Sequence, residues 1–280
     1  MKKIKILLII IIAMITSCKN NKQVDNDKIQ IYTSIYPMYD FTKKIVNDKA
    51  NVINIVGPGE EPHHFEINTK DMAKIINADL IIYNGGGMEH WIESLIEAQK
   101  NLKTINTSQN IIEENDPHFW LSPKKAKIQM QNIKNAVVEI DFENSEYYNS
   151  NYNFYAKKLD ELDEKIKNSL QNITNRYLVV THPAFSHFAE EYNFKEIAIS
   201  RDEADLKRVA DIINFIKTNN IKAIFVEEFS NDKLIQSVAN ETGANIFELN
   251  PIEALSEEYK DEDYFSIMEK NLTSITNALF

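Results

Sequence analysis

Short runs of β-branched and aliphatic residues alternate with helical patterns along this 280-residue chain from Ile29 onward. The first set comprises predicted strands at 29–34, 52–56 and 80–84 and predicted helices near 39–47 and 69–78. The second set comprises strands at 177–182, 196–199, 223–227 and 245–249 and helices near 206–219 and 233–242. Strands that alternate with helices are typical of parallel sheets covered by helices. The sequence therefore predicts an α/β protein of two lobes, at residues 29–144 and 174–280, each with a mainly parallel sheet flanked by helices.

The longest helical pattern lies between the two sets, at about 145–172. Its apolar and aromatic residues recur every three or four positions and form one stripe: Tyr148, Tyr152, Tyr155, Leu159, Leu162, Ile166 and Leu170. Charged residues fill the other faces, so we interpret the stripe as core packing and not as a cofactor site. We predict that residues 145–173 form one long rigid helix joining the lobes, with an ordinary helix of a single lobe as the alternative. A second helix is predicted from Pro123 to about Glu139, with Ser122 as its N-cap.

The N-terminal segment has the pattern of a signal peptide. Three lysines lie within the first five residues, an unbroken apolar run follows at 6–15, and the small residues Thr16 and Ser17 precede the single cysteine, Cys18. The apolar run is about half as long as the ~20 residues that a membrane-spanning helix needs. Residues 15–18 resemble a bacterial lipobox, which predicts a lipoprotein signal peptide at 1–17 and a lipid on Cys18; a free core cysteine is the alternative. Polar residues up to 28 then form a predicted flexible tether.

Composition excludes several functions. Asp and Glu outnumber Lys and Arg by 42 to 31, which gives a formal net charge of −11 at pH 7. Proteins that bind nucleic acid neutralise phosphates with clustered Lys and Arg, so nucleic acid is not a predicted partner. The six glycines form no GxGxxG, GxxxxGK[ST] or GxSxG pattern. The common dinucleotide, phosphate-loop and nucleophile-elbow signatures are therefore absent.

Three of the six histidines stand in loops or at the ends of predicted strands. His63 lies in Glu-Glu-Pro-His-His, His118 lies in Asp-Pro-His-Phe-Trp, and His182 directly follows the apolar run 178–181. The carboxyl ends of parallel strands face the ligand crevice of such folds, and imidazole suits zinc and its neighbours. The chain has no CxxC or HExxH pattern, and a single histidine in such a place is commonly an ordinary loop or core residue. The metal-site hypothesis therefore depends on the three histidines together.

Six short blocks carry a resemblance to a known family: 35–41 (IYPMYDF), 61–63 (EPH), 77–80 (NADL), 116–123 (DPHFWLSP), 181–185 (THPAF) and 250–253 (NPIE). In this order and separation, the chain resembles the metal-binding lipoproteins that serve zinc and manganese ABC importers, the cluster A-I solute-binding proteins. The resemblance covers essentially all of the chain after the N-terminal segment. It implies two α/β lobes joined by a rigid long helix, one metal ion in the cleft between them, and an ABC importer permease as partner.

Carried over residue by residue, the resemblance makes His63, His118 and His182 metal ligands and Glu253 the fourth ligand, which water replaces in some members. His64 stands where relatives often carry an acidic residue, and we interpret it as a solvated neighbour of His63.

The remaining two histidines are assigned no ligand role. His187 follows His182 by five residues and is interpreted as structural, and His90 is interpreted as exposed. Glu227 and Glu228 end a predicted central strand near the cleft and are candidates for orienting a ligand imidazole.

The ligand set favours zinc. Three imidazoles and one carboxylate suit a tetrahedral Zn²⁺ site, whereas Mn²⁺ prefers more oxygen ligands. The resemblance implies the same choice, because manganese-importing relatives carry carboxylates where this chain has His182 and Asn250. Two segments depart from the family pattern. Residues 106–115 lack the histidine-rich loop of many zinc members, and residues 203–205 read Glu-Ala-Asp where relatives usually read Glu-Pro-Ser.

The predicted function is that of a non-enzymatic, extracytoplasmic, lipid-anchored protein that captures Zn²⁺ between its lobes and delivers it to an ABC importer. A manganese-binding member of the same family is one alternative. A surface adhesin is another, motivated by the anchor and the acidic composition. A zinc hydrolase is the third, in which Glu253 would act as a general base, although no substrate-binding constellation is recognisable.

Overall fold

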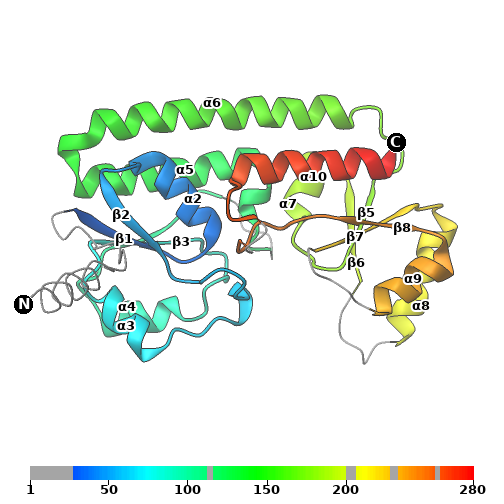
Figure 1. Cartoon of the computed structure of the whole chain (residues 1–280), viewed down its shortest axis with the longest axis horizontal. Helices are drawn as coiled ribbons and strands as arrows, with labels where there is room; N and C mark the ends of the chain where they lie inside the picture. Colours follow the sequence, from blue (N-terminus) through cyan, green and yellow to red (C-terminus); the bar gives the residue numbers. More distant parts are fainter. Residues whose placement is uncertain (1–27, 112–115, 200–205, 228–232, 256–258) are drawn as a thin grey trace, which may run out of the picture.

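Two separate four-stranded sheets organise the computed structural model, which describes residues 28–111, 116–199, 206–227, 233–255 and 259–280 (Figure 1). In the first sheet the order is β2-β1-β3-β4, with strands β1 (Ile29–Thr33), β2 (Ala50–Asn54), β3 (Leu80–Tyr83) and β4 (Thr104–Asn106). In the second the order is β6-β5-β7-β8, with strands β5 (Tyr177–Val180), β6 (Lys195–Ala198), β7 (Ala223–Val226) and β8 (Asn245–Glu248). Every strand pair is parallel. The predicted α/β fold with two parallel sheets is confirmed.

Helices connect the parallel strands, as crossovers of this kind require. The first sheet is flanked by α2 (Tyr36–Val46), α3 (Thr69–Ile75), α4 (Ile92–Ala98) and α5 (Pro123–Ile140). The second is flanked by α7 (Ser186–Glu191), α8 (Leu206–Thr218) and α9 (Lys233–Thr242). The Ser122 hydroxyl accepts the Lys125 N–H and caps α5 as the sequence predicts. The same alternation of strands and helices therefore builds two similar units along one chain, one around each sheet.

Helix α6 (Ser145–Leu170) runs along one side of the molecule past both sheets (Figure 1). Tyr148, Leu159, Leu162, Ile166 and Leu170 on its predicted stripe are buried, and Tyr152 and Tyr155 pack against the same core. The helix contacts α2 and α5 of the first unit, and its Asp163 carboxylate accepts the Tyr192 hydroxyl of the second unit at 2.9 Å. The long helix that joins the two sheets is thus confirmed, with its aromatic residues in the core.

Several local elements differ from the prediction. Helix α2 begins three residues earlier than expected, at Tyr36, because Pro37 is well suited to the first turn of a helix. Helix α4 and the three-residue strand β4 carry patterns too short to be read from sequence. The C-terminal helix α10 (Tyr264–Leu279) was also not predicted, although Asp263 and Ser266 form a capping box at its start.

The main hydrophobic core is continuous across both units. It includes Ile31 and Trp120 from the first unit, Phe185 and Phe225 from the second, and Tyr264 from α10. Each sheet also has one smaller hydrophobic cluster, beneath α3 and α4 in the first unit and beneath α8 and α9 in the second. The helices α6 and α10 lie side by side in contact, and α10 also contacts β8. Apolar packing therefore joins the two sheets through these helices in addition to the chain connections.

The predicted signal peptide at 1–17, Cys18 and most of the tether at 18–28 lie outside the described residues. Within the described part of the chain, none of the helices combines the length and the apolar character needed to cross a bilayer.

Candidate metal centre

The three predicted histidines and Glu253 converge on one point between the two sheets. His63 follows β2, His118 follows β4, His182 follows β5 and Glu253 follows β8. Each of the four therefore comes from the chain beyond the carboxyl end of a strand, where α/β proteins hold their ligands. The first unit supplies two of the side chains, and the chain after the strands of the second unit supplies the other two.

The spacing of the four ligand atoms suits a single small ion. The Nε2 atom of His118 lies 3.2 Å from Nε2 of His63 and 3.3 Å from Nε2 of His182. The Glu253 Oε1 atom lies 2.7 Å from His118 Nε2, 3.0 Å from His182 Nε2 and 3.5 Å from His63 Nε2. Four ligands bonded to zinc at about 2.0–2.1 Å in a tetrahedron would be separated by about 3.3–3.4 Å. Three of the separations, at 3.2, 3.3 and 3.5 Å, are close to this figure, and the two shorter ones, at 2.7 and 3.0 Å, join Glu253 to His118 and His182.

A short 3₁₀ helix, Pro62–His64, decides which of two adjacent histidines enters the site. The Glu61 carboxylate accepts the His63 N–H at 3.0 Å and caps this turn, and Pro62 is buried beneath it. His63 is consequently directed into the site, whereas His64 is exposed. The interpretation of His64 as a solvated neighbour is confirmed.

Asp116, which was assigned no role from the sequence, orients His118. Its Oδ1 accepts a hydrogen bond from His118 Nδ1 and another, at 2.9 Å, from the His118 backbone N–H. Its Oδ2 accepts the Ser186 hydroxyl of α7. A carboxylate on Nδ1 fixes the tautomer that leaves the Nε2 lone pair free for a metal. The signal available in the sequence was an aspartate two residues before the histidine.

Glu227 follows β7 and lies beside His182. Its Oε1 atom is 3.4 Å from His182 Nδ1, a charge contact that favours an imidazole whose Nε2 faces the other three ligand atoms. This is the place that the sequence analysis proposed for a residue orienting an imidazole. The other candidate, Glu228, lies outside the described residues.

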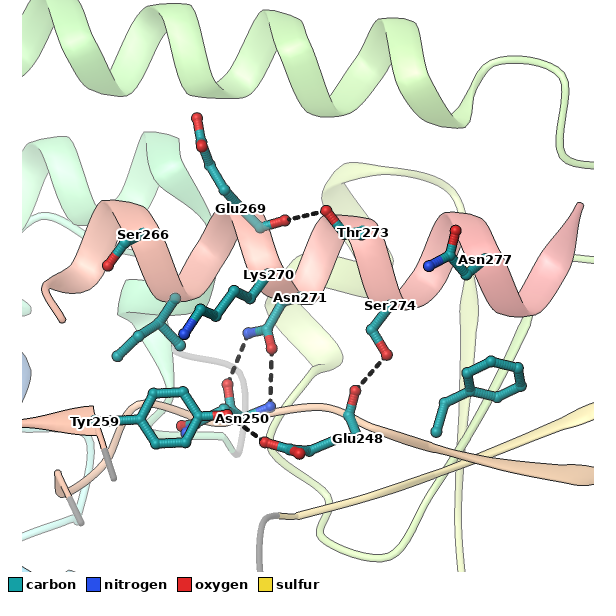
Figure 2. Close-up of a pocket in the computed structure, with 12 residues that line it drawn as sticks. Glu248, Asn250, Tyr259, Ser266, Glu269, Lys270, Asn271, Thr273, Ser274 and Asn277 are labelled. Carbon is teal, nitrogen blue, oxygen red and sulfur yellow. Dashed lines mark hydrogen bonds between the residues drawn. The ribbon is translucent and has the colours of Figure 1, made fainter. Parts of the chain in front are cut away.

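Glu253 is presented by a strained turn. Ile252 is buried and has a φ of 62°, a left-handed conformation that is unfavourable for a β-branched residue. Its N–H donates to the Asn250 side-chain oxygen at 2.7 Å. The Asn250 backbone is in turn held by two hydrogen bonds to the Asn271 side chain of α10, at 2.8 and 2.7 Å (Figure 2). Asn250 therefore shapes the turn that carries Glu253.

The last two histidines lie outside the cluster. His187 is buried, stacks on Phe119 and donates from Nε2 to the Asp116 backbone oxygen at 2.8 Å, which agrees with a structural role. His90 is exposed, as predicted.

A groove of about 630 Å³ runs between β8 and α10 (Figure 2), and among its lining residues only Asn250 belongs to the turn before Glu253. None of the four clustered side chains lines it.

The electrostatics of the cluster centre on Glu253. Burial raises the pKa of this carboxyl, but hydrogen bonds from His118, His182 and His63 outweigh burial and hold its pKa well below the ordinary value. Burial also lowers the pKa of His118, yet its bonds to Asp116 and Glu253 raise the pKa to about 9. The pKa of His182 is raised by Glu253 and Glu227 against the effect of burial. These opposite shifts favour an ionised Glu253 beside a protonated His118 imidazole.

This proton predicts a pH dependence of metal binding. Because the pKa of His118 is about 9, a metal ion must displace its proton at any lower pH. We expect the logarithm of the apparent zinc affinity to fall by at least about one per pH unit below pH 9, and more steeply once all three imidazoles protonate. Calorimetry in buffers of different ionisation enthalpy should detect proton release at pH 7. Affinity that stays constant from pH 8.5 to 5 would rule out a site made of these imidazoles.

Comparison with known proteins places the chain in a family. Residues 31–278 match the family described as ZnuA, zinc-uptake complex component A periplasmic. The chain is 33% identical over 304 residues to the zinc-binding lipoprotein AdcA of Streptococcus pneumoniae R6, which covers 98% of this chain and 60% of AdcA. It is 32% identical over 292 residues to the high-affinity zinc uptake system protein ZnuA of Bacillus subtilis strain 168, with 94% of this chain and 92% of that protein covered. The chain thus spans about 60% of the length of AdcA.

Solved structures share the fold. The crystal structure of the Zn(II)-bound ZnuA-like domain of Streptococcus pneumoniae AdcA matches with a TM-score of 0.83 at 33% identity, covering 90% of this chain and 99% of that one. The laminin-binding protein Lmb of Streptococcus agalactiae, described as a bifunctional protein with adhesin and metal transporting activity, matches with a TM-score of 0.83 at 28% identity, covering 90% of this chain and 100% of that one. The extent of the family match and the identity to AdcA and ZnuA lead to one conclusion: the chain belongs to the ZnuA family of periplasmic zinc-uptake components, the zinc-type cluster A-I solute-binding proteins.

Proposed function

We propose that this protein captures Zn²⁺ between its two α/β units and delivers it to an ABC importer. His63, His118, His182 and Glu253 are the proposed ligands. The observation that carries the proposal is the convergence of three imidazole nitrogens and one carboxylate oxygen within 4.8 Å of one another, with five of their separations at 2.7–3.5 Å. Membership of a zinc-uptake family supports the same ligand, as do the similarity to the zinc-binding lipoprotein AdcA and to the zinc uptake system protein ZnuA.

Zinc is preferred to manganese on chemical grounds. Imidazole-rich sets suit Zn²⁺, which accepts tetrahedral geometry without a preference of its own, and Mn²⁺ is the weakest binder in the divalent series. Only one of the four clustered groups is a carboxylate. Manganese binding would require more oxygen ligands than this cluster offers.

We further propose that the cluster binds and releases the ion and does not catalyse a reaction. A zinc hydrolase keeps one coordination position open for water and places its general base beside that water. Here Glu253 lies within 2.7–3.5 Å of all three imidazole nitrogens, the position of a ligand. That position supports transport over hydrolysis.

The signal-peptide pattern at the N-terminus supports a location of this protein outside the cytoplasm. We propose cleavage after residue 17, a lipid on Cys18, and a tether to residue 28 that leaves the domain free to meet the permease. In this proposal the first lobe spans 29–144, the linker helix 145–173 and the second lobe 174–280.

Zinc should stabilise the protein without the lipid. A ligand that binds only the folded state adds RT ln(1 + [L]/Kd) to the free energy of unfolding, roughly 4 kcal/mol at a thousandfold excess over Kd. We expect a large zinc-dependent rise in melting temperature for the acylated protein and an equal rise for a chain that begins after Cys18. Calorimetry of both forms checks this. Stabilisation of the acylated form alone would contradict the passive tether.

Adhesion is a second candidate function, favoured by the fold shared with the adhesin Lmb. If this protein also binds host surfaces, the surface for adhesion should be separate from the metal cluster. We expect the His118→Ala protein, deficient in zinc binding, to bind immobilised laminin as well as the parent does. Absence of laminin binding by both proteins would leave transport as the sole proposed function.

A further inference from the structure

The turn that carries Glu253 is fastened to the first unit, although it follows β8 of the second. The Trp120 indole N–H donates to the Pro251 backbone oxygen at 2.8 Å, and the Tyr36 backbone N–H donates to the Glu253 backbone oxygen at 3.3 Å. Trp120 immediately precedes α5 in the 3₁₀ turn 119–121, and Tyr36 begins α2. Two hydrogen bonds therefore attach the residues on each side of the strained Ile252 to the first unit.

The chain just beyond this turn has the same attachment. The Tyr264 hydroxyl donates to the Trp120 backbone oxygen at 2.7 Å, and its ring packs edge-on against Phe41 of α2. Lys44 of α2 lies 2.9 Å from the Asp263 carboxylate. The start of α10 is thus bound to the same surface as the Glu253 turn.

His182 is held differently. It follows β5, and Glu227 at the end of β7 lies against its Nδ1. The attachments of His182 described above are to the second sheet, whereas those of Glu253 include Trp120, which also contacts His118 with ring centroids 5.2 Å apart. Glu253 thus follows a strand of the second unit but is also bonded to the first, so three of the four ligand groups have attachments to the first unit.

We propose that Trp120 is a positioning residue that holds Glu253 on the first unit, so that His63, His118 and Glu253 form a three-ligand set and His182 alone joins the second unit to the ion. This inference rests on the proposed zinc-binding function. Trp120 is fully buried, its ring contacts the His118 ring, and its one N–H donates to the Pro251 oxygen, so the N–H is the polar group that links it to the Glu253 turn. Loss of that N–H leaves the Pro251 oxygen without this donor, so the turn that carries Glu253 is held less firmly against the first unit.

The test is a double-mutant cycle read by zinc calorimetry. Trp120→Phe removes the N–H and retains an aromatic ring. We expect it to weaken zinc binding about tenfold in the parent protein, as the loss of one buried hydrogen bond predicts. In the Glu253→Ala background the same change should alter affinity by less than about twofold, because the residue it positions is gone. In the His182→Ala background the full tenfold effect should remain.

Trp91→Phe is the matched control. Trp91 is the other tryptophan of the chain, it is buried, and its indole nitrogen has no hydrogen-bond partner among the described residues. We expect unchanged zinc affinity for this variant in all three backgrounds.

The results of this cycle distinguish a positioning role of Trp120 from a general packing role. An equal loss from Trp120→Phe in the parent and in Glu253→Ala would show a general packing role and overturn the proposal, as would a loss that disappears only in His182→Ala. If Trp120→Phe does not fold, Tyr264→Phe removes the hydroxyl that holds Trp120, and its effect on affinity should vanish in Glu253→Ala by the same logic. Failure of the parent protein to bind zinc would instead overturn the proposed function.

Discussion

Replacing His63 with alanine will weaken zinc binding by more than about 100-fold, whereas replacing its neighbour His64 will change it by less than about twofold. Residues that merely support metal ligands commonly contribute 10–100-fold to affinity, and a direct ligand should contribute more. His63 Nε2 lies 3.2 Å from His118 Nε2, in the cluster, whereas the adjacent His64 is exposed. Because the two residues share one short turn, the pair controls for changes in the backbone.

The same experiment extends to the other histidines. His118→Ala and His182→Ala should each cause a comparable loss, since each leaves a ligand position to water. His90→Ala should have no effect. His187→Ala should have a smaller effect than the ligand variants, because His187 lies outside the ligand cluster and contacts Asp116 and Phe119, which flank His118. Calorimetry that finds unchanged affinity in the His118 variant would falsify the ligand assignment.

The second large effect concerns metal selectivity. The parent protein should bind Zn²⁺ far more tightly than Mn²⁺, and His182→Glu should narrow this difference by at least about tenfold. Replacing an imidazole with a carboxylate weakens zinc more than manganese, although manganese need not become preferred. Competition titrations with the two ions measure the change.

Asn250→Asp can be combined with His182→Glu, and the structure refines what the combination should do. The Asn250 oxygen already accepts the Ile252 N–H at 2.7 Å, and an aspartate oxygen can accept the same bond. We therefore expect Asn250→Asp alone to change selectivity less than His182→Glu alone. A parent that prefers manganese, or a double variant as selective for zinc as the parent, would remove His182 from its proposed role in selectivity.

The sequence alone was enough to predict the repeated pattern of strands and helices and to place three histidines in loops or at strand ends. Periods of two and 3.6 residues report which side of a strand or helix is buried, so β1, β5, α6 and α9 were predicted from local residues alone. His182 was expected beside the cleft because it follows an apolar strand. Elements with short or mixed patterns, β4 and α4, could not be distinguished from loops on this basis.

Glu253 could not have been found from local pattern. Nothing in the residues 250–253 distinguishes a ligand carboxylate from a surface one, and its inclusion depended on family resemblance. Asp116 lies two residues before His118, and this spacing was not recognised as an orienting contact; its other partners, Ser186 and His187, lie some seventy residues away.

Local sequence thus determined most of the helices and strands, the two-sheet architecture and the strand ends at which ligands could lie. The family resemblance favoured His63 over His64. Only the tertiary structure brings four side chains spread from residue 63 to residue 253 within 4.8 Å of one another and fastens the Glu253 turn to Trp120. The physical reason is the separation in sequence over which each feature is decided. Periodicity reflects burial along one helix or strand, whereas a metal cluster depends on hydrogen bonds and packing between distant segments that meet only when the whole chain folds.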